Sequence, residues 1–525
     1  MRRIAPSAIL FTLVAATAAV APGVSSGVVA ASPAGPPLSA MARGAVTGPA
    51  RPAAYTPPPV HWGRCADAGL RRAKARCGTL VVPLDYAHPA GEKIDLAVSR
   101  VRHRAGTRYQ GVMLTNPGGP GAPGLTLSTL GALVPHHAGD GYDWIGLDPR
   151  GVGASRPALS CIPRYFHVNR PYYVPRTPAL MRTWKARAKR YAEACATSPV
   201  RQLLDHLRTV DTVQDMESLR IALGRQRLNL YGFSYGTYLG QVYATRFPDR
   251  VGRFVLDSNV DPRSVWYPAN VDQDIAFEGA IRVFFRWVAQ HDRTYHLGKR
   301  GVAIERGFFR LRERLYRHPA RGGLGPDELT DGMLAAGYYA PAWPQVAKAY
   351  AQLVNQGRTV GMLRAYRILQ SPRDDNGYAN YLATECTDAS WPSLSRQLSD
   401  AARVNRGHPF YTWGNTWFNA PCVFWPVAPK TPPTVDGRAV RGPVLLIDET
   451  RDAATPYPGS LEVRRRFPRA SLVAGVGGTS HAVSLSGVAC VDNTIAAYLR
   501  RGVVPQRKPG GGADKLCPPL RPPKP

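Results

Sequence analysis

The chain has 525 residues, 44% of them hydrophobic and 20% charged, which is enough to build a large buried core. Its formal net charge is +31. Such a charge raises the question of nucleic-acid binding, but the arginines are scattered and no nucleic-acid-binding motif accompanies them, so we expect no nucleic-acid partner. An anionic cell-wall polymer stays open as a partner for the positive charge.

The N-terminus has the pattern of a secretory signal. Arg2 and Arg3 are followed by an apolar run, residues 8–20, that is short for a membrane span. We predict a signal peptide at residues 1–31 and a flexible Pro/Ala-rich lead-in at residues 32–59. The mature protein is therefore expected to be secreted, without an integral membrane span, and association with the cell wall is left open.

Eight cysteines in an exported chain indicate disulfide bonds. They fall in neighbouring pairs along the sequence: Cys65 and Cys77, Cys161 and Cys195, Cys386 and Cys422, Cys490 and Cys517. Many other connectivities are open, so pairing between neighbours is a hypothesis. The sequence has no Cys-x-x-Cys motif, which argues against a zinc site or a redox motif.

Short apolar stretches alternate with helical stretches through the first half of the chain and again near its end. This alternation predicts a parallel α/β sheet with helices on both faces. The expected strands are residues 80–86, 94–101, 112–114, 144–147, 228–231, 254–256, 444–447 and 471–473.

The alternation stops between residues 262 and 442. This part is rich in Trp, Tyr and Arg and has helical stretches such as residues 275–289 and 332–356. An independent helical domain is one interpretation, but the return of strands afterwards favours an insertion that caps the sheet. The predicted organisation is a core built from residues 60–261 and 443–525, with a mainly helical cap at residues 262–442.

A G-x-S-x-G pentapeptide, Gly232 to Gly236, lies between an expected strand and an expected helix. That context is typical of a nucleophile elbow, in which the serine occupies the tip of a strained turn. Residues 23–27 match the same pattern, but no strand or helix is expected around them. Context therefore favours Ser234 as the nucleophile.

A serine nucleophile needs a base, and the base needs an orienting carboxylate. When the chain order is serine, acid, histidine, as it is for this type of elbow, His481 is the one histidine beyond the last acid-bearing strand. Asp452 follows the strand at 444–447 and is our choice for the acid, with Asp448 in reserve.

The tetrahedral oxyanion needs backbone N–H donors that are already in place. We expect one from Tyr235, the residue after the nucleophile, and one from Gly119 in the glycine-rich loop 117–121. The sequence has no metal-binding, dinucleotide-binding or Walker motif, so we expect neither a metal nor a cofactor.

Six segments of the chain together resemble those of a known protein family. They are residues 77–86 (CGTLVVPLDY), 116–121 (NPGGPG), 148–153 (DPRGVG), 232–237 (GFSYGT), 452–456 (DAATP) and a C-terminal region up to Cys517. The chain resembles the secreted tripeptidyl-aminopeptidase group of actinobacterial α/β-hydrolases, which is related to the proline iminopeptidases. The resemblance implies an α/β-hydrolase fold with a large, mainly helical cap inserted before the last core strands. It also implies Ser234, Asp452 and His481 as the triad, and exopeptidase action from a free N-terminus.

Three positions depart from the pattern of this family. Glu449 and Ser258 each stand where a glycine is usual, and the histidine loop reads Gly-Thr-Ser-His. None of the three removes a catalytic group, so they bear on the loop geometry around His481.

A free α-amine is expected to meet carboxylates near the cleft. Glu385 and Asp388 in the cap are the candidates, and a solvated or salt-bridged pair is the equally weighted alternative. Trp413 and Trp417 could line a proline-accepting pocket, although cap packing is the favoured interpretation for them.

The leading hypothesis is a secreted serine exopeptidase that releases short peptides or amino acids from peptide substrates through an acyl-enzyme on Ser234. A carboxylesterase or lipase with the same triad is the first alternative. A non-catalytic basic protein that binds the cell wall is the second.

Overall fold

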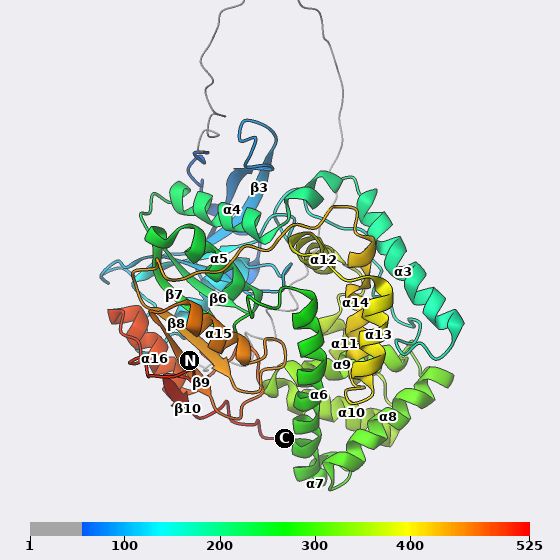
Figure 1. Cartoon of the computed structure of the whole chain (residues 1–525). Helices are drawn as coiled ribbons and strands as arrows, with labels where there is room; N and C mark the ends of the chain where they lie inside the picture. Colours follow the sequence, from blue (N-terminus) through cyan, green and yellow to red (C-terminus); the bar gives the residue numbers. More distant parts are fainter. Residues whose placement is uncertain (1–54) are drawn as a thin grey trace, which may run out of the picture.

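The computed structural model describes residues 55–525 (Figure 1). The predicted signal peptide and the lead-in as far as residue 54 lie outside the described residues. Among residues 55–525, none of the helices combines the length and apolar composition that crossing a bilayer requires.

The core is one ten-stranded sheet with the strand order β1-β2-β3-β5-β4-β6-β7-β8-β9-β10. The strands are β1 (Gly63–Arg64), β2 (Arg76–Pro83), β3 (Lys93–Val101), β4 (Gly111–Asn116), β5 (Tyr142–Leu147), β6 (Leu228–Phe233), β7 (Val251–Asp257), β8 (Val444–Glu449), β9 (Ala470–Gly475) and β10 (Lys515–Cys517).

The prediction of a parallel sheet is right from β5 to β10 and wrong at the first edge. There β1 pairs with β2, β2 with β3 and β3 with β5, all antiparallel. For β2 and β3 the reason is the short link between them, closed by a hydrogen bond from Leu84 N to Glu92 O at 2.8 Å. A link without a crossover helix can join only antiparallel neighbours.

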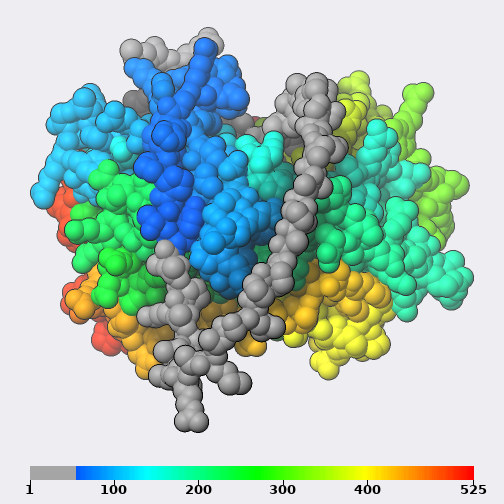
Figure 2. Space-filling view, turned by 90° about the horizontal axis from the view of Figure 1, so that it is seen from above, coloured from blue at the N-terminus to red at the C-terminus, as the bar shows by residue number. Residues whose placement is uncertain are grey.

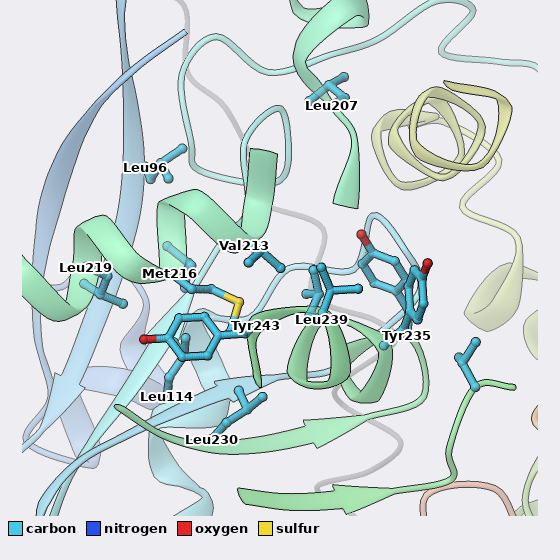
Figure 3. Close-up of a cluster of buried hydrophobic side chains, with 14 of the residues drawn as sticks. Leu96, Leu114, Leu207, Val213, Met216, Leu219, Leu230, Tyr235, Leu239 and Tyr243 are labelled. Atoms are coloured by element: carbon cyan, nitrogen blue, oxygen red, sulfur yellow. The ribbon is translucent and has the colours of Figure 1, made fainter. Parts of the chain in front are cut away.

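Both faces of the parallel part are covered, so adjacent strand residues enter different cores. Leu230 packs with Met216 of α4 (Thr209–Ala222) and Leu239 of α5 (Tyr235–Arg246), as Figure 3 shows. The next residue, Tyr231, packs on the opposite side with Ile495 of α16 (Ala489–Arg501). α15 (Pro458–Arg466) lies on the α5 side, and η1 (Leu125–Leu133) on the α16 side. Burial on both faces explains why the strand sequences are almost continuously apolar.

A helical layer lies between β7 and β8 in the chain and beside the sheet in space (Figure 1). Its helices are α6 (Tyr267–Gln290), α7 (Asp292–Tyr295), α8 (Gly301–Arg317), α9 (Pro326–Tyr338), α10 (Trp343–Gln356), α11 (Val360–Leu369), α12 (Asn376–Asp388), α13 (Leu394–Asn405) and α14 (Thr412–Asn419). Most of them share a second hydrophobic core, whereas α12 packs into the sheet core through Ala379, Leu382 and Ala383. α12 is therefore the helix that joins the cap to the sheet.

Two expectations about helices need correction. The helical stretch expected at 332–356 is two helices, because Pro341 interrupts the hydrogen-bond ladder between α9 and α10. No element was expected at α3 (Pro178–Ala196), which stands between β5 and β6 in the chain but packs with α13 and α14. In Figure 2 the teal α3 region lies against the yellow α13–α14 region.

Trp413 and Trp417 belong to this packing. Trp417 stacks on Trp184 of α3 with ring centroids 5.7 Å apart and donates from Nε1 to Tyr173 O at 2.8 Å. Trp413 stacks on Trp417 at 5.9 Å. Both are buried, so they build the cap rather than line a pocket.

All eight cysteines are paired with their sequence neighbours: Cys65–Cys77, Cys161–Cys195, Cys386–Cys422 and Cys490–Cys517. The third bond ties α12 to η6 (Ala420–Phe424), and the fourth ties α16 to β10. Four disulfides fit an extracellular protein, because the cytosol keeps thiols reduced.

Candidate active site

Ser234 occupies the turn between β6 and α5, with φ 54° and ψ −125°. It is the one partly exposed residue between buried neighbours on both sides. A Cβ added at Gly232 would lie 2.5 Å from Gly236 O, so the turn closes only with glycine there. This is the strained strand–turn–helix geometry of a nucleophile elbow.

The glycine-rich loop 117–121 passes directly over Ser234. A Cβ added at Gly118 would lie 2.8 Å from the Ser234 Cβ. The Gly118 amide is occupied, since it donates to Asn116 Oδ1 at 2.9 Å. The Gly119 amide donates to no atom of residues 55–525. The Gly119 amide therefore has no acceptor among the described residues, and Tyr235 begins helix α5 directly after the serine. That these two amides form the oxyanion hole stays a prediction.

His481 and Asp452 form a buried pair on the loops after β9 and β8. His481 Nδ1 lies 2.8 Å from Asp452 Oδ2. The other carboxylate oxygen of Asp452 accepts from Ala454 N at 2.8 Å and Thr455 N at 3.1 Å. Burial lowers the pKa of His481. The charge and hydrogen bond of Asp452 and the charge of Asp257 raise it, and the net result is a pKa above its ordinary value. The pair leaves Nε2 as the ring nitrogen that can serve as a base.

The reserve candidate, Asp448, does not reach the histidine. Its Oδ2 accepts from Ser460 Oγ on α15 at 2.6 Å. Complete burial, followed by the charge of Asp452, raises the pKa of Asp448 well above its ordinary value. Because the Asp448 side chain is bonded to α15 and Asp452 contacts His481, the geometry favours Asp452 as the acid.

The end of β7 brings the elbow and the histidine loop together. Asp257 O accepts from Ser234 N at 3.0 Å, and Asp257 Oδ2 accepts from Ser484 N at 2.8 Å. Ser258 Oγ accepts from Ala482 N, also at 2.8 Å. Ser258 thus has a defined task, since its hydroxyl holds the residue after His481. Ser234 Oγ itself has no hydrogen-bond partner within residues 55–525, and catalytic hydrogen bonds are often open before substrate binds.

Sequence reasoning missed two neighbours of His481. The first is Tyr338, the last residue of the cap helix α9. Its carbonyl oxygen accepts from His481 N at 2.8 Å, and its ring centroid lies 5.9 Å from that of the imidazole. Thr455 Oγ1 lies 3.2 Å from Asp452 Oδ2 and 3.4 Å from His481 Nδ1. No local signal marks the first contact, because it joins residues far apart in the chain; the second residue stands three positions after the acid.

Glu385 and Asp388 are neither solvated nor salt-bridged. Asp388 accepts from Thr209 N at 2.9 Å, from Thr209 Oγ1 and from Trp266 Nε1 at 3.4 Å. The Glu385 carboxylate accepts from Asn270 Nδ2 at 3.3 Å and is also hydrogen-bonded by the Tyr381 hydroxyl. Burial raises the pKa of Glu385 to about 8 and that of Asp388 to about 6. Hydrogen-bond donors of the protein therefore occupy Asp388, whereas Glu385 is a buried carboxylate that has no cationic partner within residues 55–525.

The sheet order, the elbow after β6 and the His–Asp pair on the loops after β8 and β9 define an α/β-hydrolase with a helical cap. Comparison with known proteins agrees with this class. Residues 408–515 match the family model described as TAP-like protein. The tripeptidyl aminopeptidase of Streptomyces coelicolor is 38% identical over 92% of this chain and 90% of its own.

Two further relatives come from Mycobacterium tuberculosis. Serine protease Hip1 is 29% identical over 85% of this chain and 90% of its own. Carboxylesterase B is 30% identical over 90% of this chain and 94% of its own. The chain belongs to the tripeptidyl aminopeptidase family of α/β-hydrolases and is a serine hydrolase. The resemblance and the fold class expected from the sequence are thereby confirmed.

Proposed function

We propose that this protein is a secreted serine exopeptidase that releases short peptides from the free N-terminus of peptide substrates through an acyl-enzyme on Ser234. Serine peptidase function is supported by relatives named tripeptidyl aminopeptidase and serine protease Hip1. The observation that carries the exopeptidase assignment is Glu385, a buried carboxylate in the cap that has no cationic partner among residues 55–525.

The proposed mechanism uses the groups at the carboxyl ends of the strands. His481 Nε2 takes the proton from Ser234 Oγ, which attacks the scissile carbonyl carbon. The amides of Gly119 and Tyr235 stabilise the oxyanion, and Asp452 stabilises the imidazolium. The imidazolium then protonates the leaving amine, and water, activated by the same histidine, hydrolyses the ester on Ser234.

Glu385 is proposed to bind the substrate α-ammonium group. Burial disfavours the ionised form of Glu385 and raises its pKa to about 8, and an arriving ammonium group favours that ionised form. The ionised carboxylate then gives the ammonium a strong charge-assisted partner. Glu385 is buried on α12, the helix that joins the cap to the sheet, and this supports a subsite between the cap and the sheet. The distance between the subsite and Ser234 would then limit how many residues fit before the scissile bond.

Glu385→Gln is expected to lower kcat/KM for free-amine substrates by about 30-fold or more, because a buried charge pair is lost. Substrates with a blocked amine should change little. Asp388→Asn is the matched control, since it neutralises a second buried carboxylate on the same helix that already has protein partners. Steady-state kinetics on paired free and N-acetylated peptidyl amides give the answer. Equal losses on both substrates would remove Glu385 from amine recognition.

The function itself is tested with free-amine and N-blocked mono-, di- and tripeptidyl chromogenic amides, together with short- and long-chain esters, and with Ser234→Ala as control. Cleavage of free-amine amides alone supports the aminopeptidase and gives its step length. Turnover of esters without amides would favour the esterase alternative, for which the relative named carboxylesterase B is the specific observation.

We also propose that the protein associates with the anionic cell wall. A hollow of about 570 Å³ at α2 (Ala68–Arg72) and β1 is lined by the exposed side chains of Arg64, Arg71, Arg72, Lys74 and Arg76. None of these five makes an ion pair within residues 55–525. The Cys65–Cys77 disulfide links the two ends of this segment, which keeps the five charges close together.

The triple variant Arg71→Glu, Arg72→Glu, Lys74→Glu is expected to reduce co-sedimentation with purified cell walls at low salt. Binding by the wild type should fall as salt rises, because exposed charges are screened. The control reverses Arg306, Arg310 and Arg314 on the exposed face of α8, which changes the net charge equally. Equal losses in both variants would mean that net charge, and not the hollow, determines binding.

A further inference from the structure

Glu449, at the end of β8, is a buried carboxylate that is separate from the Asp452–His481 pair. Its Oε2 accepts from Ser480 N at 2.6 Å. Its Oε1 accepts from Leu520 N at 2.7 Å. Ser480 immediately precedes His481, and Leu520 belongs to the C-terminal tail. One side chain therefore joins the histidine loop to the end of the chain.

The position of this carboxylate is built by its surroundings. A Cβ added at Gly478 would lie 2.1 Å from the Glu449 Cδ, so the histidine loop leaves room for the carboxylate only with glycine at 478. The same two loops are joined by Arg451 N to Gly478 O at 2.9 Å. Asp452 N donates to Glu449 O at 3.0 Å. Glu449 thus lies at the junction of the loops that carry the acid and the base.

The C-terminal tail, residues 518–525, is anchored at its start by Cys517 and contacts the cap near its end. Cys517 is tied to Cys490 by a disulfide, and Cys517 O accepts from Val476 N at 3.1 Å. Residues 518–525 read PPLRPPKP, a stiff sequence with few backbone N–H groups, and the Leu520 amide is one of them. At the far end, Pro523 O accepts from Trp287 Nε1 of α6 at 3.2 Å. Figure 1 shows the red terminal segment running from β10 towards α6.

The histidine loop is also held from the cap. Ser480 Oγ accepts from Ala340 N at 3.0 Å, and the His481 amide donates to Tyr338 O at 2.8 Å. The backbone on either side of the proposed base therefore has three anchors: Glu449, the end of α9, and Ser258 at the end of β7. Of these, Glu449 is the anchor that depends on the tail.

We propose that residues 518–525 form a strap that positions His481, and that Glu449 is the positioning residue to which this strap is fastened. The inference rests on the proposed role of His481 as the base. Without the strap, the loop keeps its fold but loses one restraint on the distance between His481 Nε2 and Ser234 Oγ. Loss of about an ångström of alignment costs about 10²-fold in rate.

The bridge needs two acceptor oxygens. Burial raises the pKa of Glu449 to about 7, and the amides of Leu520 and Ser480 act against this shift. On the alkaline side of this pKa the ionised carboxylate accepts from both amides. In Glu449→Gln, one oxygen still accepts, but the amide NH₂ faces the second donor. The substitution keeps the shape and breaks one of the two hydrogen bonds.

The test compares Glu449→Gln with two substitutions at the other end of the bridge. Leu520→Pro removes the N–H that Glu449 accepts, whereas Leu520→Ala keeps it and removes only side-chain packing. On a free-amine tripeptidyl chromogenic amide, assayed on the alkaline side of the Glu449 pKa, Glu449→Gln and Leu520→Pro should each lower kcat by about 10- to 100-fold. KM should stay near the wild-type value, and Leu520→Ala should behave like the wild type. The double variant Glu449→Gln, Leu520→Pro should lose little more than either single variant, because both remove the same contact.

Thermal unfolding of each variant checks that the kcat values compared are those of folded protein. Wild-type kcat in Glu449→Gln or Leu520→Pro, with Ser234→Ala inactive, overturns the strap and leaves the proposed nucleophile intact. The strap is also overturned if kcat of Leu520→Ala falls as far as kcat of Leu520→Pro, because side-chain packing would then explain the effect. It is overturned as well if kcat falls only in proportion to the loss of folded protein. Activity retained by Ser234→Ala is a different result, since it means that the proposed function has failed.

Discussion

Ser234→Ala is expected to lower kcat on peptidyl amides by about 10⁵-fold or more, because loss of the nucleophile of a triad removes the covalent route altogether. Stability should not change, because Ser234 Oγ has no hydrogen-bond partner within residues 55–525. The residual rate should be that of an enzyme which still binds substrate and still presents the oxyanion donors at Gly119 and Tyr235.

The measurement is kcat for wild type and variant on one free-amine amide, with thermal unfolding as the control for folding. A fluorophosphonate should label the wild type at Ser234, identified by mass spectrometry, and should not label the variant. Labelling at another serine, or a kcat within tenfold of the wild type, would place the nucleophile elsewhere.

Asp452→Asn is expected to lower kcat by about 10⁴-fold, because the amide favours the wrong imidazole tautomer and cannot stabilise the imidazolium. The pH profile should change as well. His481 acts as a base only when neutral, so wild-type activity rises with pH as this group loses its proton. Asp452 keeps the pKa of His481 above its ordinary value against the effect of burial. In the variant burial prevails, and the acid limb should move to lower pH.

Asp448→Asn is the matched control for this prediction. Asp448 is equally buried and lies only four residues away, but it bonds Ser460 and not His481. The substitution to Asn preserves the shape of the side chain and leaves the contact between Asp452 and His481 intact. Its kcat and its acid limb should therefore follow the wild type. If Asp448→Asn lowered kcat more than Asp452→Asn, Asp448 and not Asp452 would be the acid of the triad. Equal losses in the two variants would leave Asp452 without a special role.

The parts of the site that were predictable are those with a local signature. The elbow around Ser234 is encoded in five consecutive residues between a strand and a helix. The choice of Asp452 and His481 followed from chain order and from the strands that precede them, and the structure places the two side chains in contact. Their catalytic roles remain predictions.

The parts that escaped prediction depend on contacts between distant segments. The antiparallel first edge arises from a link too short for a helix, and α3 packs with cap helices that come two hundred residues later in the chain. Glu449 and Ser258 were visible only as departures from a family pattern. Their purpose, to hold the loop of His481, appears only when the strands are in register.

The central claim is that hydrolysis begins from a free N-terminus. The most direct measurement is mass spectrometry of the products from one unmodified peptide and from its N-acetylated form, incubated side by side with the wild-type enzyme. The account predicts that a short N-terminal fragment leaves the free peptide and that the acetylated peptide stays intact. Equal cleavage of the two peptides would contradict the account, because the α-amine, and Glu385 with it, would then have no part in recognition.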